Sequence, residues 1–504
     1  MKKILLSLVA AAAIAVQPAY GENEKLVILH TNDTHSQIDP NEKNLGGIVR
    51  RKVLVDSVRA VEKNVVLIDA GDAVQGTLYF SLFGGEVENK MMNALGYDIQ
   101  ILGNHEFDNG MDALAKYVDG VNAVMLTSNY RLDKSALAGK FHPYVIKQFG
   151  DRRVGFIAIN LIPKGMIADA NTVGVEYIDG IKTANSFAWI LKHYEGVDVV
   201  VAVTHVGYEH QPGVSDVDLA RNSEDIDVII GGHSHTLLNP NSKSSKPCKI
   251  PNLKGDSVLV AQMNKGGVYL GEITIDLSTG AKSSRLIPVD SRLDSRIDVE
   301  LAAELAPYRA AVDSVMSIPV GRAAVEFSTS DPGLLNLASD FVRVRGSELV
   351  GETVDLGVMN KGGLRRSLPK GTITKGSIMQ IMPFDNKVEV IELSGRDLAA
   401  AMDVMASRHG DGVSSNVKAK INPETGRCET VTIDGKPIAP NKIYRVATID
   451  YLANGGDYMV PFTNGEKVAL SQNVVYDDFI NYLQSKPMKG RKLRPDNTKR
   501  MSEE

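Results

Sequence analysis

The sequence predicts a protein of the α/β class with two domains, the first built of layered sheets and helices and the second smaller. Three observations support this. The chain has 504 residues, which favours more than one domain. Short runs rich in Val, Ile and Leu recur from residue 25 to about 300, and a helical stretch then separates them from a second set of strands. With 43% hydrophobic and 23% charged residues, the composition is that of an ordinary globular protein.

Residues 1–21, "MKKILLSLVAAAAIAVQPAYG", have the pattern of a secretory signal peptide. Two lysines precede an apolar run, and Ala-Tyr-Gly at 19–21 fits a small-x-small cleavage site. The apolar run is shorter than the roughly 20 residues that span a bilayer, and the tail "KRMSEE" has no hydrophobic anchor. We therefore expect export to the periplasm without a membrane anchor.

The net charge limits the class of molecule that the protein can bind. The net charge is −5, and it becomes −7 when the leader and its two lysines are removed. This mild acidity argues against a nucleic-acid polymer as partner, which would need clustered positive charge.

Cys248 and Cys428 are the only cysteines. Export would permit a disulfide, and the sequence leaves open whether these two pair.

The first domain, expected at residues 22–297, contains the predicted buried strands. Continuous apolar runs of this length suit strands that are buried on both faces. Helical patterns lie between some of them, for example at 47–63 and 181–196. The predicted strands are "LVILH" (26–30), "NVVLID" (64–69), "IQIL" (99–102), "VGFIAIN" (154–160), "VDVVVAVTH" (197–205), "DVIIGGH" (227–233) and "DSVLVAQ" (256–262).

The second domain, expected at residues 318–504, follows a linker helix at 298–317 that contains Pro307. It has strands of its own, such as "VEVIEL" (388–393) and "YRVATID" (444–450), and Gly-rich turns. If both domains contact one ligand, a hinge in the linker helix is plausible.

Five of the apolar runs in the first domain end in the same way, with side chains that commonly bind metal ions. In layered α/β folds, ligands gather beyond the carboxyl ends of the strands. The side chains are Asp33 and His35, then Asp72, then Asn104 and His105, then His205, and finally His233 and His235.

Each of these motifs alone has an ordinary interpretation as a turn, a helix cap or a core histidine, but coincidence explains their joint recurrence poorly. Five of ten histidines lie at strand ends. We expect the other five, which lack the pattern, to be structural: His30, His142, His193, His210 and His409. Asp69 lies inside a strand run and is expected to pack or to support the site, and Glu106 to be a loop carboxylate.

The mixture of carboxylate, imidazole and amide ligands suits Zn, Mn, Co or Fe better than Ca or Mg. The set is too large for one tetrahedral zinc, and it suffices for two divalent ions that share one bridging Asp. Two such ions exceed the negative charge of Asp33 and Asp72, so the site would stay positive and suit a phosphate ester. At roughly 3.5–4 Å apart, two ions can generate hydroxide and stabilise an in-line displacement.

The motifs "DTH", "GDAVQG", "GNHEFD", "TH" and "GGHSH", in this order and spacing, resemble those of the calcineurin-like metallophosphoesterases. "GNHEFD" is similar to the motif of the secreted 5′-nucleotidases, and the resemblance covers nearly the whole mature chain. It implies an αββα domain with a di-metal site and a C-terminal α+β nucleotide-binding domain. It implies one ion held by Asp33, His35, Asp72 and His235, and another held by Asp72, Asn104, His205 and His233. Some relatives have Gln in place of His235.

The resemblance also implies the catalytic pair. His105 would point to the substrate and stabilise the phosphoryl transition state or protonate the leaving oxygen. Asp108 would orient the imidazole and favour its protonated form. Glu106 and Phe107 would be spacers.

The second domain contains "NKGGLRRSLPKG" (360–371), "MPFDN" (382–386) and "DYLANGGDY" (450–458), which by themselves favour turns. The resemblance implies that Phe384 and Tyr451 stack on a nucleotide base. Asn360 and Arg365 would hold the phosphate or the ribose, and Asp457 would accept from the ribose hydroxyls.

The chain departs from the family pattern in three places. The stretch 327–340 lacks an Arg that relatives carry, Lys361 and Asp385 stand where Gly is usual, and Tyr451 replaces the commoner Phe. The resemblance favours a 5′-nucleotidase. The alternatives are a 2′,3′-cyclic-nucleotide 2′-phosphodiesterase with 3′-nucleotidase activity, a nucleotide-sugar pyrophosphatase and, more remotely, a non-catalytic nucleotide-binding surface protein.

Overall fold

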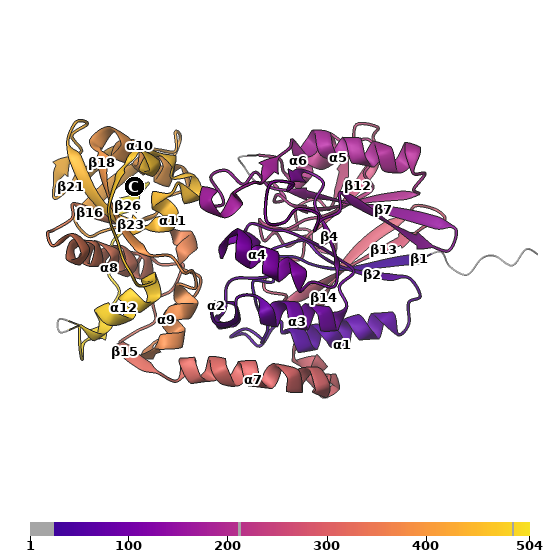
Figure 1. Ribbon diagram of the computed structural model, residues 1–504, viewed down its shortest axis with the longest axis horizontal. Helices are drawn as coiled ribbons and strands as arrows, with labels where there is room; N and C mark the ends of the chain where they lie inside the picture. Colours follow the sequence, from indigo (N-terminus) through magenta and orange to yellow (C-terminus); the bar gives the residue numbers. More distant parts are fainter. Residues whose placement is uncertain (1–24, 210–212, 486–487, 504) are drawn as a thin grey trace, which may run out of the picture.

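The computed structural model describes residues 25–209, 213–485 and 488–503. The predicted signal peptide and His210 lie outside these residues. The described chain forms two domains that face each other across a cavity, and a long helix runs along one side of both (Figure 1). Within the described residues, no helix combines the length and the apolar character needed to cross a membrane.

Two six-stranded sheets form the centre of the N-terminal domain. The first sheet has the order β14 (Lys282–Pro288), β13 (Tyr269–Asp276), β1 (Lys25–Thr31), β2 (Val65–Asp69), β3 (Ile99–Ile101) and β4 (Val124–Leu126). The second has the order β11 (Lys249–Pro251), β12 (Ser257–Ala261), β10 (Val228–Ile230), β9 (Val199–His205), β7 (Arg152–Asn160) and β6 (Tyr144–Phe149). The pairs from β1 to β4 are parallel, as are those joining β7, β9, β10 and β12, so their carboxyl ends share one edge of each sheet. A small pair, β5 (Tyr130–Arg131) and β8 (Glu176–Tyr177), lies outside them.

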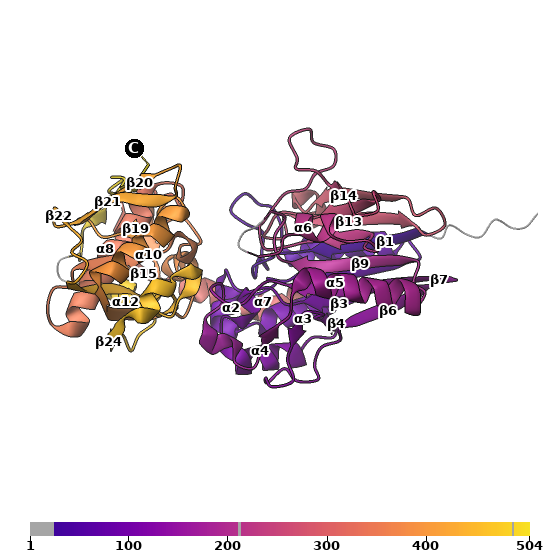
Figure 2. The same ribbon diagram turned by 90° about the horizontal axis from the view of Figure 1, so that it is seen from above.

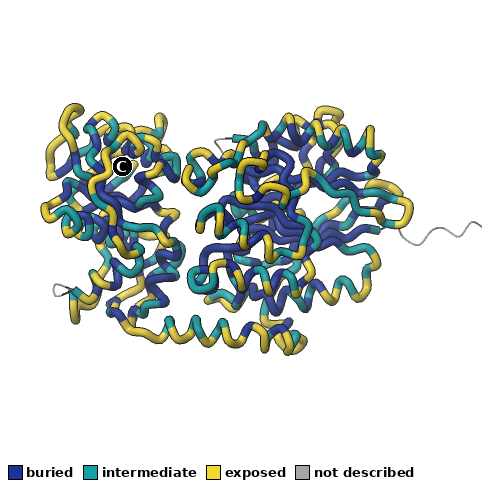
Figure 3. The backbone as a smooth tube through the Cα atoms, viewed as in Figure 1, coloured by how far each residue is buried: buried dark blue, intermediate teal, exposed yellow. Residues whose placement is uncertain are grey.

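Strand alternation creates the layers. In β1, Ile28 packs with Phe156 of the opposite sheet, whereas Leu29 points to the other face and packs with Val53 of α1 (Ile48–Arg59). Central strands such as β1 and β9 are therefore buried on both faces, which is why their runs are apolar throughout. Figure 3 shows this buried centre. The helices of the domain are α1 (Ile48–Arg59), α2 (Leu78–Phe83), α3 (Glu86–Leu95), α4 (Gly110–Asp119), α5 (Gly180–Trp189), which continues as a π-helical turn (Ile190–Tyr194), and α6 (Asp216–Arg221). The predicted αββα architecture is confirmed.

Helix α7 (Val299–Met316) connects the domains along the side of the molecule (Figures 1 and 2). The Asp298 carboxylate caps it by accepting from the backbone N–H groups of Glu300 and Leu301. Arg309 donates to Asp39 of the N-terminal domain at 2.7 Å, and this contact ties the helix to that domain.

The C-terminal domain has a five-stranded sheet whose faces are covered by helices. The sheet is β19 (Gly412–Val413), β16 (Leu356–Met359), β23 (Ile443–Ile449), β18 (Val388–Ser394) and β24 (Glu466–Leu470). Smaller sheets are formed by β17 (Gly371–Thr374), β15 (Pro319–Ala323) and β25 (Lys492–Leu493), and by β22 (Lys436–Pro437), β21 (Arg427–Ile433), β20 (Val417–Asn422) and β26 (Met501–Ser502). The helices are α8 (Pro332–Val350), α9 (Lys375–Ile381), α10 (Gly395–Ser407), α11 (Asp450–Ala453) and α12 (Val475–Gln484).

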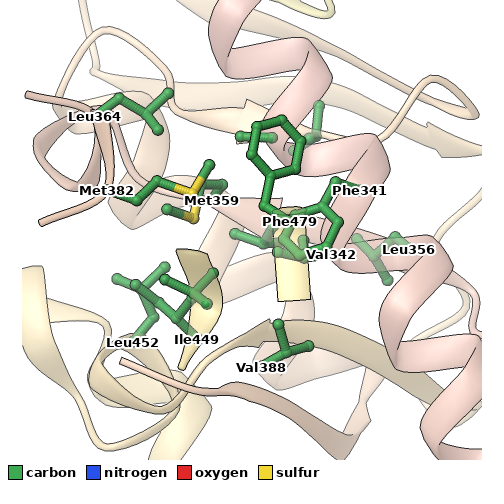
Figure 4. Packing of buried hydrophobic residues seen from close by; sticks show 14 of the residues in the cluster. Phe341, Val342, Leu356, Met359, Leu364, Met382, Val388, Ile449, Leu452 and Phe479 are labelled. Atoms are coloured by element: carbon green, nitrogen blue, oxygen red, sulfur yellow. The ribbon is translucent and has the colours of Figure 1, made fainter. Parts of the chain in front are cut away.

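The core of this domain is separate from that of the first. Phe341 of α8 and Phe479 of α12 pack with ring centroids 4.9 Å apart, beside Leu356 and Val388 of the sheet (Figure 4). The two cysteines lie one in each domain, and both are free thiols. The open question of a disulfide is thereby answered: no Cys248–Cys428 bridge is formed.

Candidate active site

The carboxyl ends of strands from both sheets of the N-terminal domain meet at one place and bring all the predicted metal-type side chains together. The backbone there is unusual. Five of these side chains belong to residues with positive φ, a region that non-glycine residues avoid: Asp33, His35, Asp72, His233 and His235. Backbone strain of this kind clusters at functional sites, because the surrounding structure must impose it.

One group of ligand atoms is formed by Asp33, His35 and His235. The Nε2 atoms of His35 and His235 are 3.1 Å apart, and Nε2 of His235 is 3.4 Å from Oδ1 of Asp33. Burial, with the charge of Arg365, holds the pKa of His35 well below its usual value, so its imidazole is neutral. Two imidazoles that face a carboxylate at these distances fit a cation between them.

A second group is formed by Asp72, His205 and His233, with Asn104 beside it. Nε2 of His205 lies 3.2 Å from Oδ2 of Asp72, and Oδ1 of Asn104 lies 2.9 Å from Nδ1 of His233. The two groups adjoin, because Nε2 of His205 is also 3.9 Å from Oδ1 of Asp33.

His205 shows why the site fits metal ions. Its Nδ1 donates to the Ala70 carbonyl at 2.7 Å, which orients the ring so that Nε2 faces Asp72. That buried Nε2 has no hydrogen-bond partner among the described residues. Burial lowers the pKa of His205, but the carboxylates of Asp72 and Asp33 raise it more, to about 10. The site therefore demands positive charge, and its oxygen and nitrogen donors fit two divalent cations.

Asn32 supports the first group, although the sequence analysis did not single it out. Its Nδ2 donates to Oδ2 of Asp33 at 2.6 Å, and the backbone N–H of His233 donates to both oxygens of the same carboxylate at 3.0 and 3.1 Å. The Asp33 carboxylate is thus oriented by three donor contacts. An Asn before an Asp carries no sequence signal for this role.

Glu106 is not a spacer, and that expectation was wrong. Its side chain is only 6% exposed, and its carboxylate accepts three backbone N–H groups: Gly103 at 2.6 Å, Ala73 at 2.8 Å and Asp72 at 3.1 Å. It therefore ties the loop after β2 to the loop after β3. Phe107 is likewise a fully buried core residue rather than a spacer.

His105 and Asp108 lie on one face of a short helical turn (His105–Phe107). Nδ1 of His105 is 2.8 Å from Oδ2 of Asp108, and the His105 backbone N–H donates to Oδ1 of Asp72 at 2.9 Å. Burial lowers the pKa of His105, but Asp108 and Asp72 outweigh it, so the pKa is raised. These carboxylates therefore favour the protonated form of the imidazole that faces the cavity.

The C-terminal domain completes the cavity, which has a volume of about 630 Å³. The Phe384 ring lies 5.9 Å from the His105 ring, and the Arg365 guanidinium carbon lies 5.9 Å from the Phe384 ring centre. The predicted residues that line the cavity are Asp72, Asn104, His105, Asp108, His233, His235, Asn360, Arg365, Phe384, Tyr451 and Asp457. Asp33, His35 and His205 are buried next to them.

Asn360, Tyr451 and Asp457 form a hydrogen-bonded group on the C-terminal wall. Nδ2 of Asn360 donates to Oδ2 of Asp457 at 2.6 Å, and the Tyr451 hydroxyl donates to Oδ1 at 2.9 Å. Oδ1 of Asn360 is buried without a hydrogen-bond partner among the described residues. The group thus keeps one acceptor available at the cavity wall.

The sequence does not predict that the loop 163–171 forms one wall of the cavity. The loop 163–171 contributes Met166, Ile167, Ala168, Ala170 and Asn171 to the lining. It also contacts the other domain, since the Tyr458 backbone N–H donates to the Gly165 carbonyl at 2.9 Å and the Tyr451 hydroxyl lies 3.1 Å from the Met166 carbonyl. These contacts use backbone carbonyls, so the side-chain pattern could not reveal them.

The positions at which the chain departs from the family pattern differ in whether they line the cavity. Asp385 lines the cavity and accepts from the Tyr476 hydroxyl at 3.2 Å, whereas Lys361 donates to the His409 carbonyl at 2.9 Å. No described residue of 327–340 lines the cavity. Asp69 accepts from the Thr31 hydroxyl at 2.6 Å beneath the site, in keeping with a supporting role. The described histidines outside the pattern do not line the cavity.

Comparison with known proteins matches both domains. A family model described as calcineurin-like phosphoesterase matches residues 26–237, and one described as 5′-nucleotidase, C-terminal domain, matches residues 317–464. The 5′-nucleotidase of Vibrio parahaemolyticus is 29% identical over 505 residues, which cover 89% of this chain and 88% of that protein. The trifunctional nucleotide phosphoesterase protein YfkN of Bacillus subtilis is 25% identical over 93% of this chain, which spans only 34% of that longer protein. The crystal structure of a 5′-nucleotidase precursor from Thermus thermophilus superposes with a TM-score of 0.84 at 28% identity and covers 95% of this chain and 99% of that one.

Proposed function

This chain belongs to the 5′-nucleotidase family, with a calcineurin-like phosphoesterase domain and a 5′-nucleotidase C-terminal domain, and we propose that it releases nucleoside and phosphate from nucleoside 5′-monophosphates. One observation carries the proposal. The metal-type ligands of one domain and the aromatic and Arg side chains of the other border the same cavity of about 630 Å³. A cavity of this size accommodates one nucleotide.

The donor set fits two ions of the Zn, Mn, Co or Fe class. Asp33, His35, Asp72 and His235 would hold one ion, and Asp72, Asn104, His205 and His233 the other. When bound, such a pair lowers the pKa of water and neutralises charge on the oxygens of an in-line displacement. The chain supports this by orienting its ligands: Asn32 directs Asp33, and the Ala70 carbonyl sets the tautomer of His205.

His105 and Asp108 handle the proton. The Asp108 carboxylate accepts from Nδ1 of His105, so the proton on Nε2 is free for the substrate. His105 donates that proton toward the phosphoryl group or the leaving 5′-oxygen. Its backbone N–H donates a hydrogen bond to the Asp72 carboxylate, which fixes the position of His105 relative to the metal-type ligands.

The C-terminal wall recognises the nucleoside. Phe384 and Tyr451 stack on the base, which contributes about 1–3 kcal/mol. Arg365, whose guanidinium lies beside Phe384, neutralises the phosphate. Asn360 orients Asp457, and together they offer oxygen acceptors to the ribose hydroxyls.

The leader-like residues 1–21 support secretion across the inner membrane and a periplasmic location, where the enzyme would act on small nucleotides. Cell fractionation of the full-length chain tests this. Protein that stays in the cytoplasm with its leader uncleaved would refute the location.

The first test of the activity is phosphate release from AMP by the purified chain with Mn or Zn added. The controls are the His105→Ala variant and protein dialysed against a chelator, both of which should lose turnover. A panel with a 2′,3′-cyclic nucleotide and a nucleotide sugar separates the related activities. Release from one of these but not from AMP would keep the chemistry and refute the monophosphate specificity.

A further inference from the structure

Gln75 is a buried polar side chain at the cavity for which neither the fold nor the chemistry described above has a use. It lies three residues after Asp72, in the loop between β2 and α2, and it borders the cavity. Its side chain is 0% exposed, and neither Oε1 nor Nε2 has a hydrogen-bond partner among the described residues. Native folds satisfy almost all buried amides, so an unsatisfied one at a cavity wall indicates a missing partner.

Gln262 shows how this fold treats a structural glutamine at the same depth. It is also 0% exposed, but its Nε2 donates to the Gly232 carbonyl at 3.1 Å. Its Oε1 accepts from the backbone N–H of Thr236 and, at 3.2 Å, from the Ser234 hydroxyl. Gln262 is fully used in holding a ligand loop. Gln75 has the same chemistry and burial, and no such partners.

The backbone around Gln75 holds it in a strained position. Its φ is +65°, and the next residue, Gly76, has a φ of +125°. A Cβ at position 76 would lie 2.9 Å from the His35 carbonyl oxygen, so only glycine fits against the ligand loop. Thr77 then caps α2 and contacts Ser36, which fixes the end of the loop. The position of Gln75 is therefore imposed by the structure rather than chosen by local preference.

The surroundings indicate which part of a substrate meets this amide. Gly76 packs on His35, whose ring lies 5.3 Å from the ring of His105. Arg365 acts electrostatically on both of these imidazoles. Gln75 thus directly precedes the residue that packs on the loop of His35, and it borders the same cavity as His105 and Arg365.

We propose that Gln75 binds the phosphate group of the substrate: its Nε2 donates to a non-bridging phosphate oxygen, and Oε1 accepts from a water that accompanies the phosphate. This assignment rests on the proposed function, because it takes the substrate to be a phosphate ester. Gln75 is kept unsatisfied in the free protein, so its hydrogen bond forms only when the phosphate enters.

The test compares Gln75→Met, which keeps the length of the side chain and removes both polar atoms, with Gln262→Met as the matched buried control. The measurements are kcat/KM for AMP, inhibition by orthophosphate, and the thermal unfolding midpoint. Gln75→Met should lower kcat/KM and weaken orthophosphate inhibition by about tenfold to a hundredfold, as expected for a lost hydrogen bond to a charged group. Its unfolding midpoint should equal or exceed that of the wild type, whereas Gln262→Met should lower it.

Two outcomes overturn the assignment. If Gln75→Met loses stability but keeps its orthophosphate affinity, a buried water satisfies the amide and the role is structural. If stability and activity fall together, the residue shapes the loop and does not bind phosphate. Calorimetric measurement of orthophosphate binding to the Mn-loaded protein distinguishes a failure of this proposal from a failure of the proposed nucleotidase function. A wild type that hydrolyses no nucleotide refutes the nucleotidase, but a phosphate affinity that depends on Gln75 still supports the contact.

Discussion

Replacing Glu106 by Gln tests whether the loops that carry the ligands are held by this one carboxylate. Its Oε2 accepts from the backbone N–H groups of Gly103 and Asp72, and its Oε1 accepts from that of Ala73. Glutamine has only one oxygen. In its best orientation the oxygen keeps the first two bonds, and the new NH₂ group then faces the Ala73 N–H, donor against donor.

The magnitude follows from that geometry. One hydrogen bond is lost, and one buried backbone N–H is left unsatisfied, each worth about 1–3 kcal/mol. We therefore expect Glu106→Gln to lower the free energy of unfolding of the N-terminal domain by about 3 kcal/mol. Because Asp72 and Asn104 lie on the two loops that Glu106 joins, the affinity for Mn should fall as well.

The assay is urea unfolding followed by a Mn titration of the same preparations. Glu209→Gln is the matched control, since the Glu209 side chain is half exposed and, among the residues that the structure describes, its ion pair is with Lys246 at the surface. That control should change stability by less than about 0.5 kcal/mol. A Glu106→Gln protein that matches the control in both stability and Mn affinity would show that the loops are held by other contacts.

Four further expectations concern the site and the core. His105→Asn should reduce kcat for AMP by roughly a hundredfold to ten-thousandfold, the usual contribution of a general acid, while thermal stability stays near that of the wild type. Chelator dialysis should abolish turnover and lower the unfolding midpoint, and Mn at about a hundred times its Kd should restore about 2.7 kcal/mol per site; an unchanged midpoint would contradict metal binding. Phe384→Ala should raise KM for AMP by roughly tenfold or more and leave hydrolysis of p-nitrophenyl phosphate nearly unchanged, because only the nucleotide has a base to stack. Burial lowers the pKa of His30 to about 4, so the unfolded chain binds the extra proton between about pH 6.5 and 4, and stability should fall by about 3 kcal/mol as the pH drops through that range. The His30→Leu variant should lose this dependence, and an unaltered pH profile of its unfolding free energy would refute the assignment.

Residues whose role depends on local pattern were predictable. The strand runs could be read because each strand is buried on both faces, as Ile28 and Leu29 illustrate, so apolar residues are required at every position. The ligand types could be read because each follows its strand directly. The fold class follows from these local patterns, and the motifs at the strand ends carry the resemblance to the family.

Residues whose role depends on partners far along the chain were not predictable. The role of Glu106 cannot be predicted from the sequence because its partners are backbone amides, which are the same in every sequence. The contacts of the loop 163–171 are unpredictable for the same reason, since they use main-chain carbonyl groups. The role of Asn32 is unpredictable because an Asn before an Asp carries no signal that its side chain orients the carboxylate.

The sequence by itself determined the layered sheets, the strand-end ligands and the existence of a second domain, because hydrophobic periodicity and side-chain chemistry are local properties. Only the tertiary structure decided which ligands meet. His35 and His235 are 200 residues apart in the chain, yet their Nε2 atoms lie 3.1 Å apart. It also decided that Phe384 of one domain faces His105 of the other, and that the Gln75 side chain is buried with no hydrogen-bond partner among the described residues. Distances, burial and hydrogen-bond satisfaction exist only once the chain has folded, and these quantities distinguish a binding group from a structural one.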